Sequence, residues 1–308
     1  MTEALINAVI PLFVLMGLGF TLGRVHKIDA TPIAITLIFG VTPIVALFAT
    51  AQIEFAAELL LLPVVGFCLA TLSGLITHFV GYEAMPDNKA HFLLAHAAGA
   101  ANTGYMGLPI VIALFDAKAV GLYILMTVGH MVYESTIGYY FIARGRLNVR
   151  DALIRIVRLP AIYAIMIGII ISALNMAIPA HFIELWKLCK GAYVVFGMAF
   201  IGIALAQYGL QVDGRLLAMG GIGKLVLQPL LAFGAIMLDA TTLHLFDTTA
   251  HQLLLIMTIT PSAANLAAFA VKENVAPDRA AAYVLLITII ALLSYPFVLP
   301  WLLAQLPA

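Results

Sequence analysis

The residues of this chain best suited to binding chemistry lie in two apolar stretches that are interrupted by polar residues, glycines and prolines. The first interruption reads Ala101-Asn102-Thr103-Gly104-Tyr105-Met106-Gly107-Leu108-Pro109, and the second reads Thr260-Pro261-Ser262-Ala263-Ala264-Asn265. Proline lacks a backbone N–H, and its ring clashes with the carbonyl four residues before it. We therefore expect both stretches to form broken helices. Pro109 then disturbs the carbonyl of Tyr105. Pro261 frees the carbonyl of Met257 in the same way.

Broken helices can bind an anion without a buried cation, because half-helix N-termini present unpaired N–H groups with partial positive charge. Paired breaks in the two halves of a membrane chain are typical of a binding site near the bilayer midplane. The amides of Asn102 and Asn265 both donate and accept hydrogen bonds, so either one orients a ligand or caps a broken helix. The alternative is that proline and glycine only kink packed helices. The candidate binding residues are Asn102, Thr103, Gly104, Tyr105, Gly107, Pro109, Pro261, Ser262 and Asn265.

Three ionisable side chains inside apolar segments, where charge is rare, are candidates for a functional role. Glu134 follows His130 by four residues, so both project from one face of a predicted helix. A carboxylate beside an imidazole can load a proton or help to hold sodium, and the alternative is a protonated, hydrogen-bonded Glu134 next to a structural histidine. Lys224 has three interpretations: it counters the charge of a bound anion, pairs with Glu134, or extends its long stem to the membrane interface.

Several classes of protein are disfavoured. The sequence has no His-Glu-x-x-His pattern, no Gly-x-Ser-x-Gly elbow and no pair of intramembrane aspartates, so we expect no enzyme and no catalytic residues. Cys68 and Cys189 lack metal-ligand spacing, and we expect no metal and no cofactor, apart from H⁺ or Na⁺ as a coupling ion. A formal net charge of zero gives no reason to expect nucleic acid as a partner.

The composition predicts the elements that position these residues. Of the 308 residues, 64% are hydrophobic and only 10% are charged, whereas soluble domains carry roughly 25% charged residues. A spanning helix needs about 20 apolar residues, and short breaks at Asp116 to Lys118 and at Asp213 to Arg215 separate neighbouring segments. We expect an all-α membrane protein with ten transmembrane helices, over residues 4–22, 33–51, 58–80, 91–115, 119–143, 159–176, 191–208, 215–238, 251–271 and 280–304.

The loop after the fifth segment sets the predicted orientation. It carries Arg144, Arg146, Arg150, Arg155 and Arg158, and loops rich in arginine stay in the cytoplasm. Both termini are then extracytoplasmic. Five segments lie on each side of the loop, and an odd number forces two similar halves into opposite orientations, as in many transporters. The expected organisation is a first repeat over residues 1–148, a basic loop over 149–158 and a second, inverted repeat over 159–308.

At the two interruptions the chain resembles the auxin efflux carrier family, whose bacterial members include malonate and malate permeases. The resemblance rests on Asn102-x-Gly104-x-x-Gly107-x-Pro109, on Pro261-x-x-x-Asn265, and on the length and mid-chain basic loop. It implies the architecture of the bile-acid/auxin transporter superfamily, in which the broken fourth and ninth helices cross at the substrate site. Helices 1, 2, 6 and 7 are then a scaffold and dimer surface, and helices 3–5 and 8–10 move as an elevator.

The resemblance also implies a function. We expect a secondary-active transporter of a small organic anion, a carboxylate similar to malonate or malate. Auxin itself is a weaker expectation, since the long hydrophilic central loop of the plant carriers is missing here. The alternative is an anion channel, or a uniporter without ion coupling, because broken helices also build selectivity filters. The expected setting is a homodimer in the bacterial inner membrane, with the anion and the lipid bilayer as partners.

Overall fold

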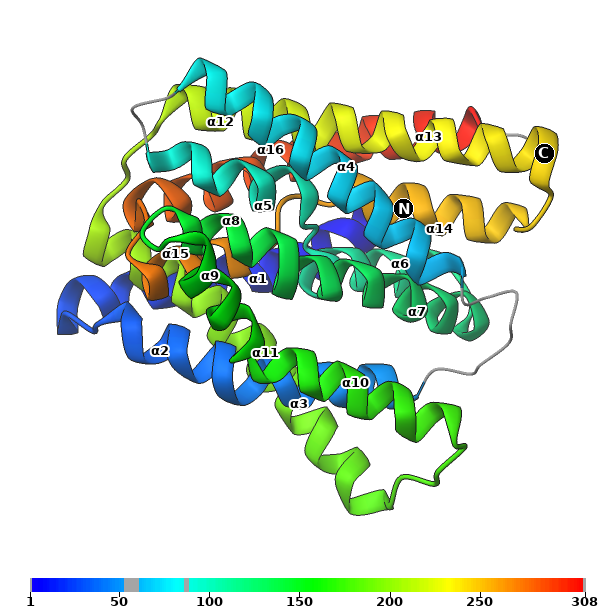
Figure 1. Ribbon diagram of the computed structural model, residues 1–308. Helices are drawn as coiled ribbons and strands as arrows, with labels where there is room; N and C mark the ends of the chain where they lie inside the picture. The colour runs from blue at the N-terminus through cyan, green and yellow to red at the C-terminus, as the bar shows by residue number, and fades with distance from the viewer. Residues whose placement is uncertain (1, 53–60, 86–88, 307–308) are drawn as a thin grey trace.

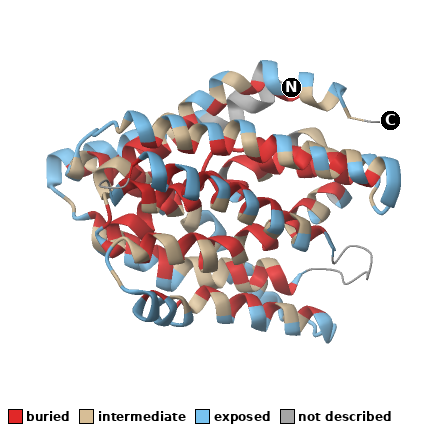
Figure 2. Ribbon diagram, turned by 45° about the horizontal axis from the view of Figure 1, so that its top comes forward, coloured by how far each residue is buried: buried red, intermediate tan, exposed pale blue. Residues whose placement is uncertain are grey.

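The computed structural model describes residues 2–52, 61–85 and 89–306, and within these ranges the chain forms helices and no strand. Figure 1 shows the helices arranged as one bundle, with α10 and the first half of α11 at one side and α4, α12 and α13 at the other. The all-α prediction is therefore confirmed for the described part of the chain. The buried residues concentrate where the helices of the bundle face one another (Figure 2).

The first half of the chain contains these elements: α1 (Thr2–His26), α2 (Ala30–Thr36), η1 (Leu37–Val41), α3 (Thr42–Ala51), α4 (Leu61–Ala84), η3 (Lys89–Leu93), α5 (Leu94–Gly99), η4 (Thr103–Gly107), α6 (Leu108–Leu114), α7 (Ala117–Tyr133), η5 (Glu134–Gly138) and α8 (Tyr139–Arg144). The second half contains α9 (Val149–Val157), α10 (Pro160–Ala173), α11 (Ala180–Tyr208), α12 (Gly214–Ile222), η6 (Gly223–Leu227), α13 (Gln228–Leu238), η7 (Asp239–Leu243), α14 (Thr248–Ile259), α15 (Asn265–Glu273) and α16 (Pro277–Ala304).

Five continuous helical stretches in the described residues are long and apolar enough to cross a membrane: Ala30–Ala51, Leu61–Ala84, Ala180–Tyr208, Gly214–Leu243 and Pro277–Tyr295. A sixth candidate combines α9 and α10, which meet at an angle of 45°. The predicted fourth and ninth segments fall outside this set because each is interrupted in its middle. The predicted count of ten spans is therefore larger than the number of continuous apolar helices, and it stays a prediction.

Aspartates begin several of the helices. The carboxylate of Asp116 accepts a hydrogen bond of 2.9 Å from the Ala119 N–H at the start of α7. Asp213 accepts bonds of 3.1 Å from the N–H groups of Arg215 and Leu216 at the start of α12. Such caps satisfy N–H groups that have no partner inside the helix. The short charged breaks that the sequence places at these two positions are thus helix starts.

Glycines let the long helices approach closely. A side chain on Gly19 of α1 would lie 2.0 Å from the backbone oxygen of Ala199 in α11, and one on Gly202 would lie 2.0 Å from that of Met16. Small residues allow this close packing between membrane helices, where van der Waals contact replaces the hydrophobic effect. Helices α3 and α10 pack in a similar way through Gly168, whose added side chain would meet the Leu47 oxygen at 2.4 Å.

Candidate functional site

The two interrupted segments meet where their helices are broken. Ala101 and Ser262 form an antiparallel bridge. Beside it the Asn102 N–H donates to the Pro261 carbonyl over 2.7 Å, and the Ala263 N–H donates to the Ala100 carbonyl over 3.3 Å. An unpaired backbone group in the membrane interior costs several kcal/mol. Each break therefore supplies partners for the other, which ties the two segments together at their crossing.

The two prolines act differently. Pro261 frees the carbonyl of Met257 as predicted, and the hydroxyl of Thr260 donates to that carbonyl over 2.8 Å. Pro109 instead lies in the first turn of α6, directly after η4. The fourth segment is broken earlier, where the backbone of Ala100 is extended and the Asn102 carbonyl accepts bonds from the next turn. The break thus precedes Pro109, because the pairing with the other segment replaces the helical hydrogen bonds there.

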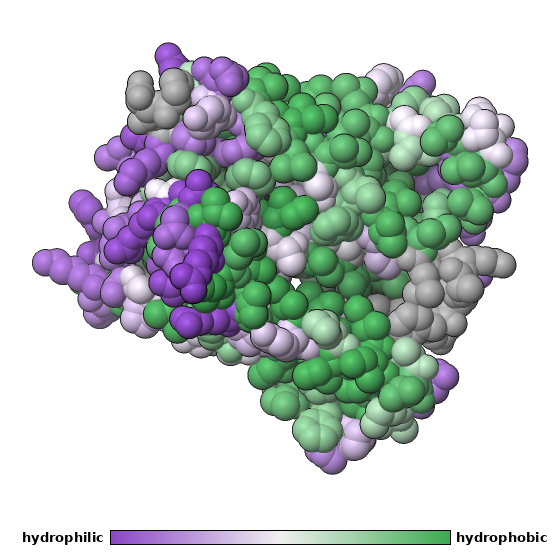
Figure 3. All heavy atoms as spheres, in the orientation of Figure 1, coloured by the Kyte–Doolittle hydropathy of each residue, from purple (hydrophilic) through white to green (hydrophobic). Residues whose placement is uncertain are grey.

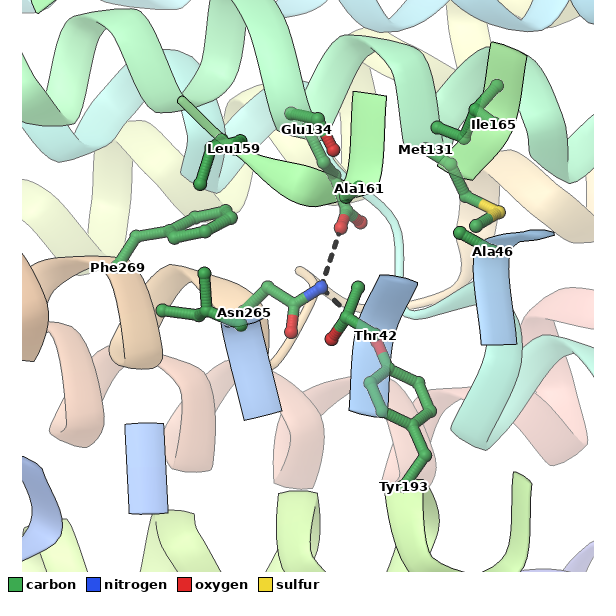
Figure 4. Close-up of a pocket in the computed structure, with 12 residues that line it drawn as sticks. Thr42, Ala46, Met131, Glu134, Leu159, Ala161, Ile165, Tyr193, Asn265 and Phe269 are labelled. Carbon is green, nitrogen blue, oxygen red and sulfur yellow. Dashed lines mark hydrogen bonds between the residues drawn. The ribbon is translucent and has the colours of Figure 1, made fainter. Parts of the chain in front are cut away.

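A small pocket lies beside this crossing. The Asn265 Nδ2 donates to the Glu134 Oε2 over 2.8 Å and to the Tyr193 Oη over 3.2 Å (Figure 4). Asn265 is the first residue of α15, Glu134 begins the π-helical turn η5, and Tyr193 belongs to α11. Single π-helical turns inside helices occur often at functional sites. Three segments distant in sequence thus converge on one amide.

The pocket has a volume of about 40 Å³, which holds a few water molecules at most. Figure 4 shows the side chains of Glu134 and Asn265 pointing toward each other, with Phe269 and Thr42 beside them. Its lining comes from η1, α3, α10 and α11 and from α7, η5 and α15, together with Leu159 directly before α10. The lining residues are Ile38, Thr42, Ala46, Met131, Glu134, Ser135, Leu159, Ala161, Ile165, Tyr193, Asn265 and Phe269.

Lys224 is fully buried, so its stem does not extend to the surface. Its Nζ donates to the Gln228 Oε1 and, over 3.2 Å, to the Thr258 carbonyl near the end of α14. The Gln228 Nε2 donates to the Gly99 carbonyl at the end of α5 over 2.8 Å. Both carbonyls lie at helix C-termini, which carry partial negative charge. Within the described residues no ion pair joins Lys224 to Glu134.

His130 belongs to the same buried network. Its Nε2 lies 3.4 Å from the Gln228 Nε2, and its Nδ1 has no hydrogen-bond partner. The chain therefore places His130 beside Gln228, and Glu134 beside Asn265. His130 and Glu134 thus have different hydrogen-bond partners, and a joint role in coupling stays a prediction.

The remaining predicted binding residues lie around the crossing and differ in how far they are buried. The Ser262 hydroxyl is buried and bonds to the Ala97 carbonyl and, over 3.0 Å, to the Tyr283 Oη. The Thr103 carbonyl accepts a bond of 3.4 Å from the Tyr123 hydroxyl. Gly104 is exposed, with open space beside it. The side chain of Tyr105 lies outside the described residues.

Gly107 has a steric reason to be glycine. An added side chain would lie 1.7 Å from the Tyr123 Oη, so this turn of η4 packs directly on α7.

The sequence did not identify four residues of this region. Tyr193, Thr42 and Ser135 line the pocket, and Gln228 links Lys224 to the end of α5. The sequence shows Tyr193 as a polar aromatic residue inside a predicted span. That feature alone does not mark a binding residue, because aromatic residues are common in membrane helices. No three His, Cys, Asp or Glu side chains gather as a metal site in the part of the chain that the structure describes.

The chain is similar to known membrane transporters. A family model described as "Membrane transport protein", which covers the auxin efflux carriers, matches residues 144–299. An "Uncharacterized transporter" of Methanothermobacter thermautotrophicus is 23% identical over 307 residues, covering 94% of this chain and 96% of the relative. Both similarities agree with the apolar helices of the structure. The chain is an integral membrane transporter, not an enzyme, and it belongs to the membrane transport protein family.

Proposed function

We propose that this protein is a secondary-active transporter of a small organic anion, a carboxylate of the size of malonate or malate, and that it binds the anion where the two broken segments cross. The observation that carries the proposal is the convergence of Asn265, Glu134 and Tyr193 beside that crossing. The Asn265 amide and the Tyr193 hydroxyl are donors that a carboxylate accepts from. The start of α15 adds the partial positive charge of a helix N-terminus.

The pocket as it stands is too small for malonate, since about 40 Å³ accommodates only water-sized groups. The geometry fits a closed state, in which Asn265 bonds to protein groups rather than to a substrate. Binding then requires the two groups of helices around the pocket to separate or slide. Substrate oxygens would replace Glu134 and Tyr193 as partners of the amide.

An elevator movement of α4 to α8 and α12 to α16 against α1 to α3, α10 and α11 is our proposal for that step. The proposal is supported by the lining of the pocket, to which helices of both groups contribute residues. The contacts also favour an inverted repeat of five segments each: the first segment packs on the seventh (α1 on α11), and the second packs on the sixth (α3 on α10). If the halves change places, the first segment takes the place of the sixth and the seventh takes the place of the second. The contact of the first with the seventh then becomes the contact of the sixth with the second, as a two-fold relation between the halves requires.

Glu134 is the proposed coupling group. A carboxylate that shares an amide with the substrate can take up a proton or help to hold sodium when the substrate binds, and intramembrane carboxylates commonly serve in such relays. His130 and Lys224 form the buried polar layer behind it. A purely potential-driven uniporter is the alternative, since each charge gains about 2.3 kcal/mol per 100 mV. We place the protein in a bacterial inner membrane as a homodimer, with both termini extracytoplasmic.

Binding of candidate anions to purified protein in detergent tests the substrate class. Malonate or malate at saturating concentration should raise the midpoint of thermal unfolding, because a ligand of the native state stabilises it by mass action. The Asn265→Ala variant should lose that rise when it is compared with its own midpoint without ligand, which falls because Glu134 and Tyr193 lose their donor. Acetate and phosphate serve as control anions. A rise that is equal for all four anions, or a rise that persists in Asn265→Ala, would contradict the proposed site.

A further inference from the structure

The basic segment in the middle of the chain contains an amphipathic helix. Residues 144–158 carry five arginines, and Asp151 is the acidic residue among them. Within this segment α9 spans Val149–Val157, and the side chain of Asn148 caps it by accepting a bond of 2.9 Å from the Asp151 N–H. The helix is therefore a defined element and not an irregular loop between two halves of the protein.

The two faces of α9 differ in exposure. Val149, Leu153 and Val157 recur every four residues and lie on one face, with exposed fractions of 50%, 50% and 60%. Ala152 is fully buried, so the face next to Val149 packs on the protein, while Asp151 and Arg155 on the side opposite Leu153 are exposed. Exposing three branched apolar side chains in a row to water is unfavourable, since burying each one is worth about 1.5–3 kcal/mol. The outer face of α9 therefore requires a cover.

Arginines flank this apolar face. Val149, Leu153, Ile154 and Val157 line a shallow surface groove together with Arg150 and Arg158. In Figure 3 hydrophilic residues gather over this region of the molecule, and hydrophobic residues lie directly beside them. An apolar stripe edged by arginines matches an acyl chain below a negatively charged headgroup. It is the pattern of helices that lie in the plane of a membrane interface.

The position of α9 favours a lipid cover over a protein partner. The helix leads directly into α10, and the chain turns by 45° between them. The outer face of α10 exposes Met166, Ile167 and Ile170, so exposed apolar side chains continue from α9 onto the helix that follows it. The bend turns α9 away from the axis of α10, and its arginines are suited to the charged headgroup region at the end of a span.

We propose that α9 is an interfacial helix that binds anionic phospholipid, with the guanidinium groups of Arg150 and Arg158 on the phosphate and the Val149, Leu153 and Val157 face on the acyl chains. Arginine suits this role because its planar group forms paired hydrogen bonds to phosphate oxygens. The proposal is independent of the transported substrate. It assigns a lipid site to the loop that joins the two halves of the chain.

Tryptophan fluorescence tests the depth of α9. The chain has two tryptophans, Trp186 and Trp301, which are first replaced by phenylalanine. Leu153→Trp then places a single reporter on the apolar face, and Asp151→Trp places a matched reporter on the polar side of the same helix. In vesicles of phosphatidylglycerol brominated on its acyl chains, we expect strong quenching of the first reporter and weak quenching of the second. Quenching of Leu153→Trp that is absent, or no stronger than that of Asp151→Trp, would overturn the proposal.

The lipid class is tested by titrating phosphatidylglycerol or phosphatidylcholine into the full-length protein in detergent and measuring retained lipid by native mass spectrometry. We expect preferential retention of phosphatidylglycerol, and a loss of about fivefold in affinity for each arginine changed in Arg150→Gln and Arg158→Gln. The matched control is the pair Lys187→Gln and Lys190→Gln, which are exposed cations of α11. Inorganic phosphate at millimolar concentration should not compete. Equal retention of the two lipids, unchanged retention in the arginine variants, or competition by free phosphate would contradict the assignment.

Discussion

Asn265 links three parts of the protein through one side chain. Its amide donates to Glu134 and to Tyr193, and its backbone begins α15 directly after the crossing of the broken segments. A donor in this position is ready to exchange its protein partners for a substrate oxygen. The same exchange would release Glu134 to bind a proton or a cation. Substrate binding and coupling are thus connected through a single amide in the mechanism that we propose.

Replacing Asn265 by alanine should reduce transport at least about tenfold, because a lost hydrogen bond to a charged group costs roughly 1.5–3 kcal/mol. Asn102→Ala keeps the backbone bonds of the crossing and removes only the side-chain amide, and we expect a similar loss if that amide contacts the substrate at the crossing. Uptake into vesicles, normalised to the amount of folded protein, measures both. Gln52→Ala removes an exposed amide at the end of α3 and is the control. Wild-type uptake in both asparagine variants would refute the role of the crossing.

Glu134→Gln separates the coupling role from a packing role. Glutamine keeps the shape and can still bond to Asn265, but it neither ionises nor carries charge. We expect uptake by this variant to lose its dependence on the pH gradient or on the cation. Measuring uptake over a series of external pH values, with and without sodium, distinguishes these two cases. If uptake by the variant keeps the wild-type dependence on pH and sodium, Glu134 has a structural role and is not the coupling group.

Helix α7 offers a test of close packing at the scale of one element. A side chain on Gly129 would lie 1.9 Å from the backbone oxygen of Pro63 in α4, whereas Gly121 on the same helix has open space beside it. Gly129→Ala should therefore cost about 1–3 kcal/mol through overpacking. Gly121→Ala should be neutral or stabilise the helix by up to about 1 kcal/mol. Thermal unfolding in detergent measures both, and a Gly129→Ala midpoint at or above that of Gly121→Ala would disprove the tight contact.

The breaks in the helices were predictable from sequence because proline, glycine and charge act locally. Pro261 frees a carbonyl wherever it stands in a helix, and Asp116 or Asp213 can cap only the helix that follows it. The position of the first break was less predictable. It depends on the pairing of Ala101 with Ser262, which lie far apart in the chain.

The partners of the buried polar groups were not predictable for the same reason. Tyr193 reaches Asn265 across 72 positions of the sequence, and Gln228 reaches Gly99 across 129. The helical period specifies which residues share a face of one helix, but not which other helix that face meets. Lys224 illustrates the difference: its place inside an apolar segment followed from sequence, and its contacts with Gln228 and Thr258 did not.

The whole molecule is proposed to move as two bodies, and cysteine pairs can test this. Ala46 of α3 packs in one cluster with Ala164 of α10 and with Met131 of α7. In a background without Cys68 and Cys189, a disulfide between Ala46→Cys and Met131→Cys would join the two proposed bodies and should stop transport until it is reduced. A disulfide between Ala46→Cys and Ala164→Cys lies within one body and should leave transport intact. Full transport with the first disulfide formed would contradict the elevator proposal.

Uptake of radiolabelled malonate and malate into proteoliposomes that contain the purified protein tests the central claim most directly. Membrane potential, pH gradient and sodium gradient are set separately, and the Asn265→Ala variant is measured beside the wild type. We predict saturable uptake of at least one of the two anions that responds to one of these gradients and is lost in the variant. Flux that fails to saturate would favour a channel, and the absence of flux under every gradient would contradict a carrier of small carboxylates.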